Sequence, residues 1–163
     1  MTSYETLIDM FFRRVEKDKK FFLYVGLSEA GSMQLARDRA MGYMEEALAM
    51  MTLMCQPKVN FSDRDDIAAQ FHFDLTATEK LLVSALMYRQ YLQRDIGYLK
   101  TLSVNYTATD LRVFDPSNAR STFMTMYNAI CAECDALMDM YKNTDRENGS
   151  YVGIDFDAYD VET

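Results

Sequence analysis

A long helix-forming stretch, residues 73–102, constrains the fold more than any other part of the chain. Thr76 is followed three residues later by Glu79, a spacing typical of a capping box at the start of a helix. No glycine or proline occurs in the twenty residues after Thr76. We therefore predict a helix from Thr76 to Lys100, which would be about 37 Å long at ~1.5 Å per residue.

This predicted helix has two apolar faces, whereas an ordinary surface helix has one. The first face comprises Leu81, Ala85, Tyr88, Leu92, Ile96 and Leu99, and the second comprises Val83, Met87, Tyr91 and Tyr98. Two faces indicate either a helix central to its domain or one that also packs on a neighbouring subunit. We expect the first face to form the subunit core. The second face would pack under the N-terminal helix or against a neighbour, so its four residues are candidate subunit-interface residues.

The remaining periodicity predicts a mainly α fold, a bundle of about four helices. Further helices are expected over about 3–18, 29–55 and 116–142. Thr2 and Glu5 form a weak capping box for the first. Ser28 and Glu29 mark the approach to the second, which Pro57 ends, and Asp115 precedes Pro116 at the start of the last.

Two segments between these helices have no clear helical period. The aromatic run 21–25 is expected to be a buried turn or a short extended segment, and periodicity does not decide between them. Residues 103–114 are expected to form a linker. A linker of this length is typically functional or held by a partner.

A small β-hairpin excursion is expected over about 58–75. Lys58–Phe61 and Gln70–Leu75 are β-prone and flank the polar stretch Ser62–Asp66. An isolated hairpin is marginal in water, so it would lean on the body or receive a strand from a partner. Within the polar stretch, Arg64, Asp65 and Asp66 are candidate subunit-interface residues.

The chain divides into a helical domain, residues 1–143, and an extended acidic-aromatic tail, residues 144–163. The tail is either a disordered, solubilising end or a docking peptide that orders on a partner. In the docking interpretation its partner-binding anchors are Tyr151, Ile154, Phe156 and Tyr159.

Charge and composition restrict the class of protein. The 163 residues are 49% apolar with a net charge of −8, and residues 143–163 carry six acidic groups against one basic group, Arg146. The nearest basic cluster, residues 13–20, is interleaved with acids and is typical of a solvated helix face. We expect no specific nucleic-acid binding. No apolar run approaches the ~20 residues of a membrane span and no export signal is evident, while three cysteines indicate a reducing compartment.

Residues that could carry chemistry are few. His72 is the only histidine, and Cys131 and Cys134 have the C-x-x-C spacing but lie within a predicted helix, with Cys55 and His72 as the only further zinc ligands. The acid pairs Glu45/Glu46 and Asp135/Asp139 are expected on polar helix faces. No phosphate-binding or nucleophile motif occurs. The sequence therefore predicts an interaction protein without catalytic, metal or cofactor sites, not an enzyme.

The order of elements adds a resemblance. A helix ending in Met54-Cys55-Gln56-Pro57 is followed by the segments 58–66, 71–76 and 79–87, and then by 95–102 and 111–117. This order of elements and the local sequence of the loops, over roughly residues 28–143, resemble those of the small helical head–tail connector (adaptor) proteins of tailed bacteriophages.

The resemblance implies a structural subunit of a homo-oligomeric ring, commonly of twelve copies, at the neck of a virion. The ring would contact the portal protein and a tail or stopper protein, and DNA would pass through its channel without specific binding. It would assemble in the host bacterial cytoplasm, with no membrane involved. The alternative function is a small cytoplasmic helical binding module or regulator that uses its C-terminal tail as a docking peptide.

Overall fold

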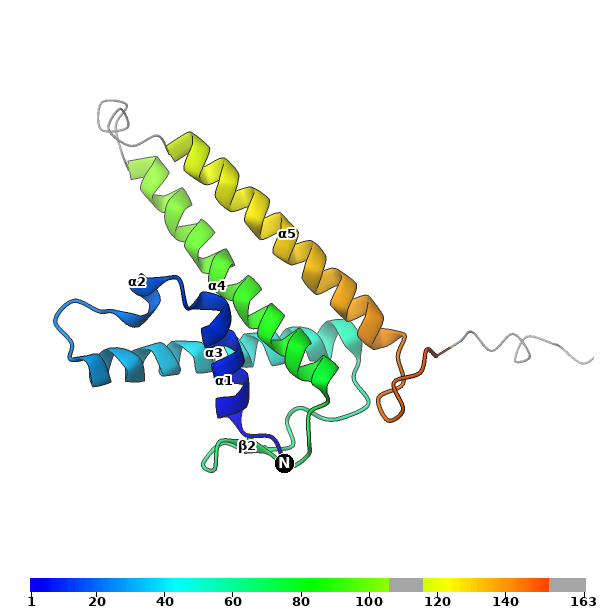
Figure 1. Cartoon of the computed structure of the whole chain (residues 1–163). Coiled ribbons are helices and arrows are strands. Elements are labelled where there is room, and N and C mark those ends of the chain that lie inside the picture. The colour runs from blue at the N-terminus through cyan, green and yellow to red at the C-terminus, as the bar shows by residue number, and fades with distance from the viewer. Residues whose placement is uncertain (106–115, 153–163) are drawn as a thin grey trace, which may run out of the picture.

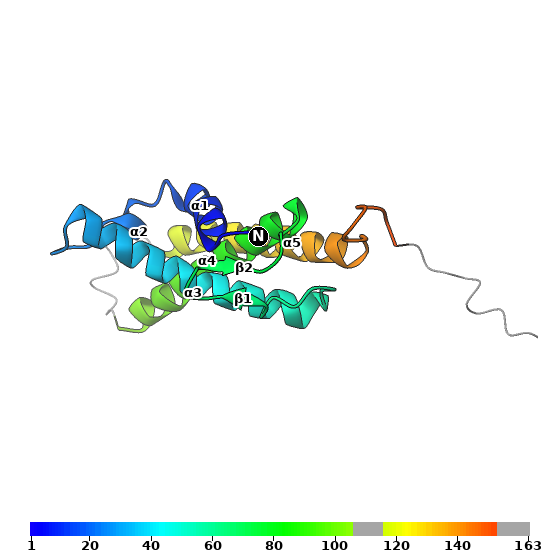
Figure 2. The ribbon, with the colours of Figure 1, turned by 90° about the horizontal axis from the view of Figure 1, so that it is seen from below.

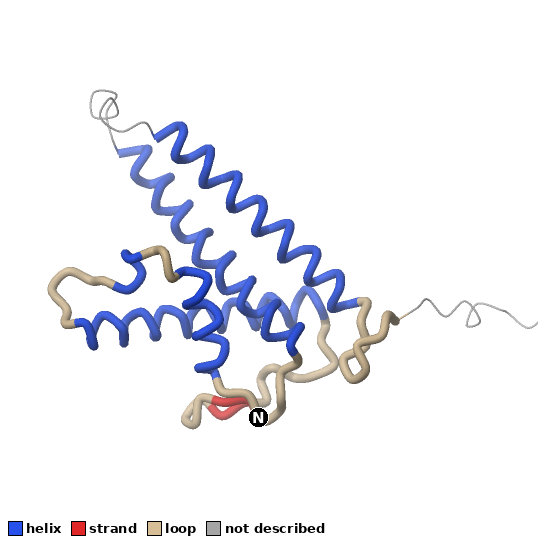
Figure 3. Tube along the Cα trace, viewed as in Figure 1, coloured by secondary structure: helices blue, strands red, loops and turns tan. Residues whose placement is uncertain are grey.

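The computed structural model describes residues 1–105 and 116–152, without the side chains of residues 20, 95–105 and 116–120. Four helices of twelve residues or more dominate this part, with a two-stranded antiparallel hairpin, so the predicted mainly α fold is confirmed (Figures 1 and 3). In chain order the elements are α1 (Tyr4–Val15), α2 (Lys19–Phe22), α3 (Glu29–Cys55), β1 (Arg64–Asp65), β2 (Gln70–Phe71), α4 (Ala77–Asn105) and α5 (Pro116–Lys142).

Helix α4 lies at the centre, with α1, α3 and α5 packed against it. It runs antiparallel to α5, and the two form an arm that extends beyond the other helices (Figure 1). Seen from below, α3 crosses this pair (Figure 2). The predicted capping box is confirmed: the Thr76 amide donates to Glu79 Oε2 (2.8 Å) and the Glu79 amide donates to Thr76 Oγ1 (3.2 Å).

The burial of α4 decides between the two expected positions of its second face, which packs inside the chain beside α1, and corrects the first face at Leu81. All six residues of Leu82–Met87 are buried, because neighbouring helices cover several sides of α4. Val83, Met87 and Tyr91 lie in the core of the single chain, so their assignment to a subunit interface is wrong. The fourth candidate, Tyr98, lies outside the described side chains. Leu81, expected in the core, is 39% exposed.

An aromatic cluster explains why the second face is inside. The rings of Phe11 (α1), Phe21 (α2), Tyr43 (α3) and Tyr91 (α4) have centroids 5.4–6.5 Å apart, mostly in edge-to-face geometry. Such pairs each contribute about 0.5–1.5 kcal/mol beyond burial. One cluster thus holds four helices together.

Several predicted boundaries move. The N-cap of α1 is Ser3, whose hydroxyl accepts from the Glu5 amide (3.2 Å), and Thr2 is not the cap. The aromatic run 21–25 begins inside the short helix α2. Helix α4 extends to Asn105, so the first three residues of the expected linker are helical, whereas 106–115 lie outside the described residues. Helices α3 and α5 have the predicted bounds.

The hairpin forms, but its first strand is not the predicted one. Arg64–Asp65, within the polar stretch, pairs with Gln70–Phe71, whereas Lys58–Phe61 is not a strand. The N-terminus of the same chain adds to the hairpin edge: the Tyr4 amide donates to the Ala69 carbonyl (2.9 Å) and the Phe71 amide to the Thr2 carbonyl (2.9 Å). The hairpin therefore leans on its own body, and residues 2–4 occupy the edge where a partner strand was considered.

Candidate interaction surfaces

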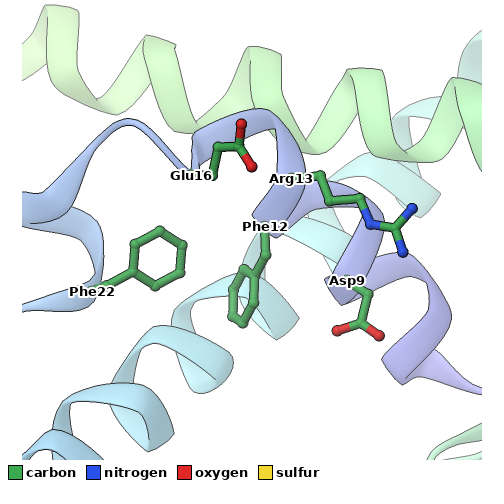
Figure 4. Close-up of a pocket in the computed structure, with 5 residues that line it drawn as sticks. All are labelled: Asp9, Phe12, Arg13, Glu16 and Phe22. Atoms are coloured by element: carbon green, nitrogen blue, oxygen red, sulfur yellow. The ribbon is translucent and has the colours of Figure 1, made fainter.

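A groove of about 470 Å³ lies between α1 and α2, lined by Asp9, Phe12, Arg13, Glu16 and Phe22 (Figure 4). Phe12 and Phe22 are half-buried, and their ring centroids are 5.2 Å apart at 83°. Both rings also contact buried Phe21, which belongs to the aromatic core. The groove therefore has an aromatic floor, packed on the core, with charged side chains around it.

Some charged side chains near this groove form ion pairs or hydrogen bonds within the described part of the chain, and others do not. Arg14 pairs with Glu133 of α5 (3.1 Å), and Asp18 accepts from the hydroxyl of Tyr91. Within residues 1–105 and 116–152, the ion pairs do not involve Arg13, Lys17 or Lys19, nor the acids Asp9 and Glu16. Arg13 lines the groove itself, Lys17 follows in the turn after α1, and Lys19 is the first residue of α2.

A second surface is the loop between α2 and α3, residues 23–27, with apolar side chains turned to solvent. Leu23 is 64% exposed, Val25 is fully exposed and Leu27 is 50% exposed. Gly26 permits the turn with a φ of +87°, and the Leu27 amide donates to the Tyr24 carbonyl (3.2 Å). Contiguous exposed apolar residues are typical of interaction sites.

Arg39 of α3 holds this loop in place. Its guanidinium donates to the Tyr24 hydroxyl (2.6 Å) and the Tyr43 hydroxyl (3.4 Å), and it lies over the rings of Phe21 and Tyr24 at 5.1 and 5.8 Å. Because Tyr24 is anchored inward, its neighbours Leu23 and Val25 are displayed outward by a preorganised loop.

The C-terminal loop, residues 143–152, forms a third surface and is held to the body by Arg146. Its guanidinium donates to both carboxylate oxygens of Glu79 (2.8 and 3.2 Å) and to the Asp74 carbonyl (2.6 Å). Glu79 is fully buried and also accepts from the Tyr141 hydroxyl (3.0 Å). Burial and the charge of Glu79 hold the pKa of Tyr141 above its ordinary value. Sequence reasoning missed this network, although Arg146 is the only basic residue of the acidic segment 143–163.

Asp145 gives the same loop its internal shape. Its carboxylate accepts from Lys58 (2.7 Å) and from the amides of Glu147 and Asn148 (2.9 and 3.2 Å). The lysine and these amides lower the pKa of Asp145 to about 2. The Val152 amide then donates to the Asn143 carbonyl (2.8 Å). Residues 144–152 are therefore bound to the helical body, and a domain boundary at 143 does not match these contacts.

The predicted tail anchors are only partly described. Tyr151 is 75% exposed and faces Thr144 in a β-bridge, and its neighbour Val152 is 53% exposed. Ile154, Phe156 and Tyr159 lie outside the described residues.

The hairpin candidates make contacts within the chain. Arg64 pairs with Asp66 (3.1 Å) and lies 3.9 Å from Glu45 of α3, while Asp66 accepts from the Tyr4 hydroxyl (2.7 Å). Burial and this hydrogen bond raise the pKa of Tyr4 to about 12. Asp65 accepts from the Ile67 and Ala68 amides and shapes the turn. The fully exposed side chain at the hairpin tip is Ile67.

The cysteine and histidine side chains considered for catalysis or metal binding do not form a common site. Cys134 and Cys55 are buried, Cys131 is half-buried in mid-α5, and burial raises the pKa of Cys134 to about 11, which disfavours a reactive thiolate. His72 Nδ1 lies 2.6 Å from Asp63 Oδ1 on the exposed hairpin. Within the described ranges, no group of three or more histidine, cysteine and carboxylate side chains could hold a metal ion.

The acid pairs take part in surface ion pairs. Glu45 and Glu46 face Arg64 and Arg94, and Asp135 and Asp139 face Arg89 and Lys142. Exposed pairs of this kind contribute little to stability, about 0–1 kcal/mol each. Their position matches the expected polar helix faces.

No protein-family model, curated protein or solved structure matches the chain. Among the described helices, none is both long and apolar enough to cross a membrane.

Proposed function

We propose that this chain is the subunit of a homo-oligomeric ring that joins a phage portal to its tail. The observation that carries the proposal is the placement of two different surfaces at opposite ends of the molecule. The apolar loop 23–27 lies on the α2 side, and the C-terminal loop with exposed Tyr151 and Val152 lies on the far side, in both views (Figures 1 and 2).

Different surfaces on opposite sides favour head-to-tail contacts, which close into a ring when the rotation between subunits allows it. The loop 23–27 is preorganised by Arg39, which lowers the entropic cost of such a contact. The net charge of −8 suits a channel that DNA crosses without being gripped. Because the sequence resembles head–tail connectors, we assign the proposed ring to the virion neck.

Native mass measurement and sedimentation of the full chain test the ring. The double variant Leu23→Asp/Val25→Asp should remain folded, because both side chains are exposed, and should lose assembly. Gln93→Asp places one such negative charge at an exposed polar position of α4 and should assemble normally.

Binding to a portal protein, and the presence of the chain in purified phage particles, test the neck assignment. A chain that is absent from particles, stays monomeric and binds no portal would contradict the proposal. That result would favour the alternative, a small binding module.

A further inference from the structure

We propose that the α1–α2 groove receives the C-terminal segment, residues 153–163, of a second copy of this chain. The inference deepens the proposed ring and rests on self-association. It starts from the groove, whose half-buried Phe12 and Phe22 leave aromatic surface in contact with solvent beside Arg13 (Figure 4).

The segment 153–163 has the complementary composition. It contains four acidic side chains, no basic one, and two aromatic side chains three residues apart, Phe156 and Tyr159. Arg13 lines the groove, and Lys17 and Lys19 follow it closely in the sequence. The ion pairs of the described residues do not involve these three side chains, so they can meet the carboxylates of the segment. An added ring can extend the edge-to-face pair of Phe12 and Phe22.

The two acids of the groove limit how the segment can lie. Asp9 and Glu16 also border it, and they would repel carboxylates placed directly against them. We therefore assign the aromatic side chains to the floor between Phe12 and Phe22, and the acidic ones to Arg13, to Lys17 in the turn after α1 and to Lys19 at the start of α2.

The position of the C-terminal loop favours a second copy over the same chain. Val152 follows a loop that Arg146 and Asp145 tie to the start of α4 and to Lys58. The groove lies between α1 and α2, on the α2 side of the molecule and away from the C-terminal loop (Figures 1 and 2). A segment that leaves one side of each subunit and binds a different surface of the next makes a head-to-tail contact.

Complementation between two full-length variants tests this contact. The groove variant, Arg13→Glu/Lys17→Glu, retains its C-terminal segment, and the segment variant, Phe156→Ala/Tyr159→Ala, retains its groove. Each alone should self-associate about tenfold more weakly than the parent chain, and an equimolar mixture should recover hetero-association of the two. Lys142→Glu, a charge reversal on α5, should not weaken association.

A direct measurement uses a synthetic peptide of residues 152–163 and the full-length segment variant. Binding should weaken about tenfold when Arg13 and Lys17 are reversed. It should also weaken with rising salt and be lost for a scrambled peptide of equal charge. Equal binding of the scrambled peptide, a mixture that fails to recover association, or a peptide that binds only a portal protein would overturn the proposal.

The outcomes separate this inference from the ring itself. If the parent chain forms rings but the peptide does not bind the groove, the inference is overturned and the proposed ring is retained. A peptide that binds the groove of a chain that never forms rings supports the groove contact and contradicts the ring.

Discussion

Glu79 shows how one residue can serve two structural roles. Its backbone and carboxylate complete the capping box of α4, and the same carboxylate, fully buried, binds Arg146 and Tyr141. A buried charge is tolerated only when it is paired and hydrogen-bonded. The residue that starts the central helix therefore also determines where the C-terminal loop attaches.

Arg146→Ala should lower the free energy of unfolding by about 2–3 kcal/mol, because it leaves Glu79 buried without its cation. Urea denaturation at neutral pH measures the loss. The matched control is Arg37→Ala, which breaks the exposed 2.7 Å pair with Glu5 and should cost less than about 1 kcal/mol. Equal losses in the two variants would contradict a special role for the buried pair.

At the scale of elements, the C-terminal loop is held by electrostatic contacts more than by apolar burial. Lys58 and two amides of the loop stabilise the Asp145 carboxylate. The folded-state pKa of Asp145 is about 2, below its ordinary 3.8. The stabilisation is therefore complete above pH of about 4 and is lost as the pH falls towards the folded value.

Amide chemical shifts of Glu147 and Asn148, followed by NMR from pH 5 downwards, should titrate with a midpoint near the folded-state pKa of Asp145, about 2. Asp145→Asn should abolish the titration, because the amide side chain carries no charge. A midpoint at the ordinary aspartate value in the parent chain would show that the contacts with Lys58 and the two amides do not form in solution.

At the scale of the whole molecule, the structural body extends beyond the boundary that composition indicated. Residues 144–152 reach the start of α4, the hairpin segment and the residues after α3 through Arg146 and Asp145. Residues 144–152, which composition assigned to the tail, are thus part of the folded body.

Two truncations test this extent. A chain ending at residue 143 should melt about 5–10 °C below the full chain, because it loses Arg146 and its neighbours. A chain ending at residue 152 should melt like the full chain when both are monomeric. Circular dichroism at low protein concentration measures both melting temperatures. A full-length melting temperature for the shorter chain would place the boundary back at 143.

Local sequence patterns predicted the elements well where the deciding contacts are between residues close in the sequence. The Thr76–Glu79 capping box, the bounds of α3 and Pro116 at the start of α5 all depend on contacts within a few residues. The first hairpin strand was misplaced because β-propensity depends on cross-strand partners. Here Gln70–Phe71 pairs with the polar Arg64–Asp65 on one edge, and residues 2–4 of the distant N-terminus supply the contacts on the other.

The sequence by itself determined that the long central stretch is a helix with two apolar faces. Its local periodicity and cap are sufficient for that conclusion. Only the tertiary structure decided what covers those faces: Tyr91 packs beside Phe11 and Phe21 of its own chain, so the second face is core. The pairing of Glu79 with Arg146 was likewise decided by packing, because two residues 67 positions apart meet only when α5 returns along α4.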